Sequence, residues 1–172
     1  MESWFWQDDD LAAGESLDCY AQIIVTVIDH ASLLAAPRYA RQALAGVDAC
    51  AADAPGRLWG CVVLPETVRL IVGPGSAGAI EAFVARLKAE TSARLLAAIR
   101  RADDDALDVV LRYSPVWGGA LYRVWQAGYH LGRFWSEYRL SNALYEMMRL
   151  PEDLGLVPRA EDWPFRYVGG EA

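Results

Sequence analysis

Short apolar runs alternate along the chain with longer segments in which apolar residues recur every three or four positions. The runs 19–28, 57–64 and 67–72 are rich in β-branched residues, which is typical of strands. Only Pro65 and Glu66 separate the second run from the third. Because parallel strands need a much longer connection, these two runs predict an antiparallel hairpin.

Two helices are predicted before residue 103. Pro37 suits the first turn of a helix, and the residues after it favour continuation to about residue 52. Ser76 has the side chain of an N-cap and precedes a segment that extends to about residue 102. The apolar positions of that segment recur at helical spacing: Ile80, Phe83, Val84, Leu87, Leu95 and Ile99. The three aspartates at 103–105 are expected to end this helix, and residues 108–120, which contain Pro115 and Gly118-Gly119, predict a linker or an insertion.

The last third of the chain predicts one more strand and one more helix. The strand covers 124–134, and the helix covers 135–150 and ends at Pro151. The resulting order is strand, helix, strand, strand, helix, strand, helix, which predicts an α+β fold with an antiparallel sheet covered by helices on one side. Residues 1–18 have no clean periodicity and are interpreted as an arm before a single domain, 19–172.

Composition narrows the class of protein. A chain of 172 residues has the length of one domain, and 54% hydrophobic residues exclude the composition of disordered proteins. The longest uncharged stretch, 70–80, is much shorter than the roughly 20 apolar residues of a membrane-spanning helix. The acidic N-terminus is unlike a secretory signal. Cys19, Cys50 and Cys61 lack paired spacing, which indicates buried thiols in a reducing cytoplasm.

Most of the net charge of −7 lies in the arm. Residues 1–18 hold six acidic residues and no basic one, so the rest of the chain holds 16 basic and 17 acidic residues. Arginines and aromatic residues are concentrated between 112 and 149. Arginine neutralises phosphates and aromatic rings stack on unpaired bases, so this mixture can bind single-stranded nucleic acid. On composition alone, aromatic residues in the core and solvated arginines are the favoured interpretation.

Common catalytic motifs are missing. There is no phosphate-binding GxxxxGK[ST] loop, no GxGxxG after a strand, no GxSxG, no CxxC and no HExxH. Two histidines exclude a metal site built mainly from imidazole. The aspartates at 103–105 can attract Mg²⁺ but are more typical of a solvated helix end. A Cys61–His130 nucleophile pair is disfavoured because Cys61 falls in an apolar strand, where thiols are usually inert.

Three segments, in this order, resemble the REP-associated tyrosine transposases, a branch of the HUH superfamily of single-strand transposases and nucleases. Segment 58–72, LWGCVVLPETVRLIV, is similar to the family's strand, turn and His-x-His strand. Val124-Trp125-Gln126 is similar to its Val/Ile-Trp-Gln. Pro151 with GLV at 155–157 and EDWPF at 161–165 are similar to NPVxxGLV and EDWPxSS. The resemblance covers most of the chain after residue 19 and implies a ferredoxin-like, HUH transposase-type fold.

The departures from this family concern its catalytic residues. Its two metal-binding histidines correspond to Thr67 and Arg69, and a guanidinium, which stays protonated, cannot ligate a cation. Its nucleophilic tyrosine corresponds to Glu146. Tyr145 lies one residue earlier, which rotates its side chain by about 100° on a helix. The resemblance therefore implies a catalytically degenerate member, without a metal or another cofactor.

The leading hypothesis is a transposase-like protein that binds single-stranded or hairpin DNA and has lost strand cleavage. Arg69 would then contact a phosphate in place of the metal. The expected DNA-binding residues are Arg69, Arg112, Arg123, Arg133, Arg139, Trp125, Tyr129 and Trp135. We expect a cytoplasmic monomer or homodimer with no membrane partner.

Two alternatives stay open. A repurposed protein-interaction module is supported by the pI of about 4.8 and by the acidic arm, because negative charge opposes DNA encounter and an acidic arm can occupy a basic groove as a DNA mimic. An active enzyme would instead use Tyr145, with Mg²⁺ or Mn²⁺ held by Glu66 or Glu146.

Overall fold

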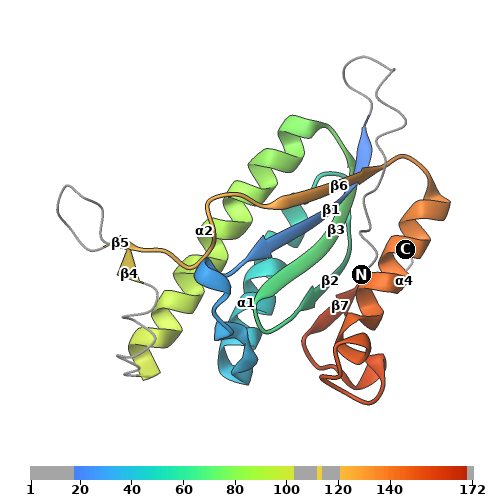
Figure 1. Cartoon of the computed structure of the whole chain (residues 1–172). Coiled ribbons are helices and arrows are strands. Elements are labelled where there is room, and N and C mark those ends of the chain that lie inside the picture. The colour runs from blue at the N-terminus through green and yellow to red at the C-terminus, as the bar shows by residue number, and fades with distance from the viewer. Residues whose placement is uncertain (1–17, 103–111, 114–120, 170–172) are drawn as a thin grey trace.

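Figure 1 shows the computed structural model of the chain, which describes residues 18–102, 112–113 and 121–169. The acidic arm, apart from Asp18, and the three aspartates at 103–105 lie outside the described residues. None of the described helices is both long enough and apolar enough to cross a membrane.

The centre of the fold is a five-stranded antiparallel sheet. Its strands are β1 (Cys19–Thr26), β2 (Leu58–Val63), β3 (Thr67–Gly75), β6 (His130–Phe134) and β7 (Arg166–Val168). Their order across the sheet is β6-β1-β3-β2-β7, and each neighbouring pair is antiparallel. The predicted hairpin is β2 and β3, and the predicted α+β class is confirmed.

Two helices, α1 (Pro37–Cys50) and α2 (Ala77–Ala102), pack on one face of this sheet and lie behind it in Figure 1. The Ser76 hydroxyl accepts a 3.3 Å hydrogen bond from the Ala79 amide, which confirms the predicted N-cap of α2. Alternate strand residues such as Ile23 and Leu70 point toward the two helices and are fully buried with them. This layer contains most of the hydrophobic core.

A third helix, α4 (Glu137–Asp153), lies on the other face of the sheet, so the expected cover on one side only was incomplete. Met147 and Met148 pack against Val62 and Ile71, which point away from α1 and α2. β2 and the middle of β3 are buried on both faces and read as apolar runs, whereas Thr67 and Arg69 at the start of β3 are only partly buried. The apolar runs were consistent with helices on both sides of the sheet, which the predicted one-sided cover did not include.

The predicted end of α4 at Pro151 is also corrected, because the helix continues to Asp153. In the last turn a proline removes only one intrahelical hydrogen bond. The chain leaves the helix at Gly155, two residues after Asp153, where the positive φ of 69° suits glycine. The Leu156 amide donates to the Pro151 carbonyl at 2.8 Å and the Gly155 amide to the Glu152 carbonyl at 2.9 Å, the two bonds of a Schellman cap.

The predicted strand 124–134 is shorter in the structure, where β6 begins at His130. The Lys88 ammonium donates to the backbone carbonyls of Gln126 at 2.7 Å and Gly128 at 2.6 Å. These carbonyls therefore bind a side chain on α2 instead of a neighbouring strand. Trp125 contributes one isolated bridge, to Val27.

The sequence patterns missed several short elements. Strand β4 (Arg112–Tyr113) lies within the region interpreted as a linker or insertion and pairs with β5 (Leu121–Tyr122), which directly follows that region. Strand β7 had no counterpart among the predicted strands. Four 3₁₀ helices complete the described elements: η1 (Ile28–His30), η2 (Leu33–Ala35), η3 (Ala51–Asp53) and η4 (Ala160–Asp162).

We expect Gly46→Ala to lower stability even though alanine favours helices. A Cβ atom on Gly46 would lie 2.6 Å from Thr91 Cγ2 and 3.1 Å from Thr91 Cα, so α1 and α2 would have to separate, at a cost of about 1–3 kcal/mol. Gly78, also helical, has nothing within 4 Å of the same position, so Gly78→Ala should be neutral or stabilising by up to about 1 kcal/mol. Urea unfolding of both variants tests this, and a stabilised Gly46→Ala would contradict the tight helix contact.

Candidate nucleic-acid interface

Helix α4 covers only part of its face of the sheet. It crosses β2 where that strand has Gly60, and a Cβ atom there would lie 2.6 Å from Leu144 Cδ1. On β1, Gln22 and Ile24 point to the α4 side yet remain partly exposed, and His130 on β6 is exposed. Figure 1 shows no helix in front of β1 and β6, whereas α4 lies to the side of β2 and β7. Tyr20 of β1 and Phe134 of β6 pack in the α4 cluster, so the uncovered part consists of Gln22, Ile24, Gly132 and His130 with the neighbouring Arg69; we call it the open half of the α4 face.

Strand register places an arginine and a histidine on this open half. Ile24 on β1 is paired with Arg69 on β3 and with His130 on β6. Directly paired residues of antiparallel strands point to the same face, so the side chains of Arg69 and His130 flank that of Ile24. With neighbouring strands about 4.8 Å apart, the Cα atoms of Arg69 and His130 are roughly 10 Å apart. Thr67 lies two residues before Arg69 and therefore on the same face.

Arg69 is half-buried, and its Nε atom is buried without a hydrogen-bond partner. Within the part of the chain that the structure describes, no carboxylate forms an ion pair with it. Burial lowers the pKa of Arg69, yet a guanidinium keeps its proton in proteins. A buried donor without a partner loses its bonds to water and gains none in return. The sheet therefore holds a positive charge that the described residues do not neutralise.

The residues at this place do not fit a divalent cation. Thr67 and Arg69 occupy the positions at which the resemblance implies two histidine ligands, and the guanidinium repels a metal ion. Glu66, considered as an alternative ligand, accepts a hydrogen bond from the Ser32 hydroxyl and lies 3.6 Å from His30 Nδ1. Among the described residues no three His, Cys, Asp or Glu side chains cluster in a way that could hold a metal.

Tyr145 and Glu146 lie on the solvent side of α4. The residues of α4 that face the sheet include Leu140, Met147 and Met148, whereas the Tyr145 side chain is 63% exposed. Its hydroxyl accepts a 3.1 Å hydrogen bond from Arg149, one turn along the same helix. Glu146 is exposed as well. Neither side chain packs against the sheet beside Arg69.

Among the side chains that the structure describes, the Arg and aromatic residues between 112 and 149 do not form one surface. Trp125 is only 4% exposed and donates a 2.9 Å hydrogen bond to the Thr91 hydroxyl, so its ring belongs to the core and not to a stacking platform. Tyr129 packs against the same core. Arg133 is paired with Ala21 and so lies on the α1–α2 side of the sheet.

The remaining candidates of this stretch lie elsewhere. Trp135 is 52% exposed and Arg139 is exposed, both at the start of α4. Arg123 is exposed and lies just after β5. Arg112 is the first residue of β4. Among the expected DNA-binding residues whose side chains the structure describes, only Arg69 lies on the open half. His130, which lies on the same row, was not among the expected residues. The sequence placed His130 in the predicted strand 124–134, but which residues lie beside it depends on the pairing of β6 with β1.

The structure also separates Cys61 from His130. Cys61 points into the α1–α2 core, while His130 lies on the opposite face and three strands away. Complete burial raises the pKa of the Cys61 thiol to about 12, which leaves it protonated and unreactive at neutral pH. The two residues therefore form no nucleophile pair.

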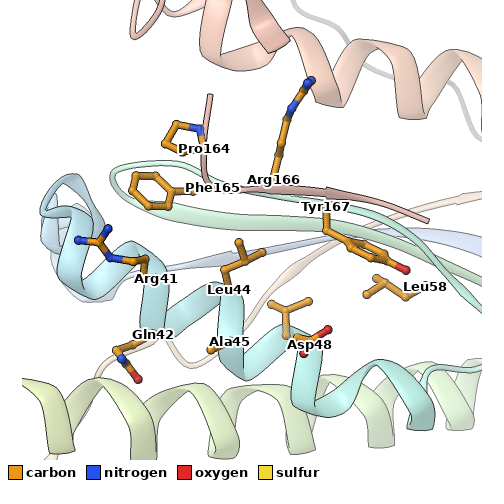
Figure 2. A pocket seen from close by; sticks show the side chains of 11 residues that line it. Arg41, Gln42, Leu44, Ala45, Asp48, Leu58, Pro164, Phe165, Arg166 and Tyr167 are labelled. Carbon is orange, nitrogen blue, oxygen red and sulfur yellow. The ribbon is translucent and has the colours of Figure 1, made fainter. Parts of the chain in front are cut away.

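A shallow groove of about 600 Å³ lies on the other side of the sheet, between α1 and β7 (Figure 2). Leu44 and Asp48 of α1 and Phe165 and Tyr167 around β7 line it. Figure 2 shows Arg166 pointing away from this groove, toward the α4 side. Its register partner Val62 is fully buried in the α4 cluster, so covered surface separates Arg166 from Arg69.

Comparison with known proteins agrees with this fold. No protein-family model and no curated protein matches the sequence. Among solved structures, a REP-associated tyrosine transposase bound to a REP hairpin is similar with a TM-score of 0.59 and 15% identity, over 91% of this chain and 82% of that chain. A predicted transposase from Deinococcus radiodurans R1 has a TM-score of 0.46 and 19% identity, over 78% of this chain and 92% of that chain. The first similarity confirms the fold that the resemblance implied.

We expect Arg69→Met to be at least as stable as the unchanged protein. Methionine keeps the long apolar stem but removes the unpartnered guanidinium, so the free energy of unfolding should stay equal or rise by up to about 1 kcal/mol. Urea unfolding at neutral pH measures this difference. A loss of about 2 kcal/mol or more would show that Arg69 stabilises the fold through a partner.

Stability should also fall as the pH rises above about 9. The folded state keeps the Cys61 proton up to a pKa of about 12, whereas an unfolded thiol, with a pKa near 9.0, releases it, so deprotonation favours unfolding between these values. Cys61→Ala should reduce this slope, with the part due to Cys19 and Cys50, whose pKa values are also raised, remaining. Urea unfolding at pH 8 and pH 10 tests it, and identical slopes in both proteins would contradict the burial effect.

Proposed function

We propose that this protein binds single-stranded or hairpin DNA on the open half of the α4 face and does not cleave it. The observation that carries the proposal is Arg69, a half-buried guanidinium without a described partner at the centre of that face. Phosphate groups of DNA are the anions that this side chain binds well, because its planar fork makes two parallel hydrogen bonds to them.

The fold supports the same conclusion. The chain has, over most of its length, the fold of a transposase whose structure contains a REP hairpin. The net charge of the chain without its arm is close to zero, so attraction to DNA must come from local basic groups and not from overall charge. Arg69 is such a group, and the imidazole of His130 lies on the same row of the open half. Trp135 and Arg139 are exposed near the start of α4, outside the open half.

The proposed loss of cleavage follows from the residues at the catalytic positions. Strand cleavage by a tyrosine of this family requires a nucleophile aimed at the phosphate and a cation that neutralises the developing charge. Here Thr67 and Arg69 replace the metal ligands, Glu146 replaces the tyrosine, and Tyr145 lies on the solvent side of α4. Binding without reaction is the function that these residues support best.

Fluorescence anisotropy with labelled hairpin, single-stranded and duplex DNA tests the proposal. We expect preferential binding of the hairpin or single strand, with equal affinity in Mg²⁺ and in EDTA. The affinity should fall with salt, with a log–log slope of about −0.7 for each phosphate contacted on a single strand. No binding at low salt would contradict the proposal and favour a protein-interaction module.

A separate assay tests whether the protein cleaves DNA. After incubation with DNA and Mg²⁺ or Mn²⁺, denaturing electrophoresis should show free protein and intact DNA. A covalent protein–DNA adduct that disappears in Tyr145→Phe would contradict the proposed loss of activity and establish Tyr145 as a nucleophile.

A further inference from the structure

We infer that Arg69, together with His130, forms a phosphodiester-binding site that replaces a metal ion on the sheet, so that a backbone phosphate of the bound DNA is the counterion of the Arg69 guanidinium. This inference rests on the proposed function and assigns its central contact.

The first argument is that partial burial of the Arg69 guanidinium without a hydrogen-bond partner at Nε lowers the stability of the fold. The Arg69 Nε is buried and unpartnered, and burial lowers the pKa of the group because the charged form loses hydration. Removing one partner of a buried charge is strongly unfavourable unless another anion takes its place. Since the described carboxylates do not approach Arg69, a ligand from outside supplies the most direct compensation.

The second argument is access. Ile24, which separates Arg69 from His130, is partly exposed, whereas Val62 on the other flank of Arg69 is fully buried in the α4 cluster. A ligand therefore reaches Arg69 from the β1–β6 side and meets His130 there. Gly132 and Gln22 lie on the next row of the same face, and a Cβ atom on Gly132 would contact only the Gln22 side chain. No side chain on β6 covers this row.

The third argument is the kind of anion. A guanidinium binds carboxylates and phosphates with the same two-bond geometry. A nucleic-acid strand presents its phosphates at the outside of the chain, where an open sheet surface can meet them, and a second donor such as His130 can contact the same strand. The site needs no metal, since the guanidinium already supplies the positive charge.

The experiment compares Arg69→Ala with Arg41→Ala in hairpin binding. Arg41 is an exposed arginine on α1, on the opposite side of the sheet, so its variant loses the same charge away from the site (Figure 2). We expect Arg69→Ala to bind at least about tenfold more weakly with a salt slope smaller by about one phosphate, and Arg41→Ala to match the unchanged protein. Arg69→Lys should recover only part of the affinity, because lysine lacks the planar fork.

An NMR titration with inorganic pyrophosphate separates the two claims. The Arg69 Nε–H signal, identified by its loss in Arg69→Lys, should shift on addition of pyrophosphate. Hairpin binding that is equally strong in Arg69→Ala would overturn the inference and the proposed location of the DNA, while DNA binding itself would stand. A pyrophosphate shift without any DNA binding would overturn the proposed function and retain an anion site, and neither response would overturn both.

Discussion

A guanidinium cannot release its proton when it is buried, and this constraint on Arg69 governs what its face of the sheet can do. A lysine or histidine in the same place could become neutral, whereas Arg69 keeps its charge next to Ile24 and Val62. The charge excludes a divalent cation and attracts an anion. The proposed DNA binding follows from this one guanidinium and from the absence of a carboxylate partner for it among the described residues.

The rest of the fold makes that position rigid. Arg69 lies on β3, which pairs with β1 and β2 in the middle of the sheet. The residues on either side of it, Val68 and Leu70, are anchored in the core beneath α1 and α2. Helix α4 and its cluster then cover β2 and the Tyr20–Phe134 end of β1 and β6, and leave Gln22 and Ile24 of β1 partly exposed. The guanidinium is therefore held on a strand with core packing on one face and access from one direction on the other.

Local patterns were sufficient for much of the fold. β1, the β2–β3 hairpin, α1 and α2 follow from β-branched runs, a two-residue connection, Pro37 and Ser76. The patterns failed where distant residues decide the structure. The Lys88 ammonium binds the carbonyls of residues 126 and 128, and Trp125 donates to Thr91, so this segment leaves the strand conformation that its apolar residues favour. The three residues of β7 are too few for a periodicity.

The candidate site shows the same division. Thr67 and Arg69 share a face because they are two residues apart on one strand, which the sequence alone predicts. Arg69 and His130 lie near each other because β6 pairs with β1, and more than 100 residues separate these two strands in the sequence. No local sequence pattern predicts this pairing. The Arg-rich stretch 112–149 appeared continuous in sequence, but strand alternation and the turn into α4 distribute it over both sides of the sheet.

A crystal structure of the protein with a DNA hairpin, grown in the presence of EDTA, tests the central claim most directly. The account predicts a backbone phosphate within hydrogen-bond distance of the Arg69 guanidinium, on the open half of the α4 face, with Tyr145 unattached to DNA. A hairpin bound on the α1–α2 side, with Arg69 far from any phosphate, would contradict it.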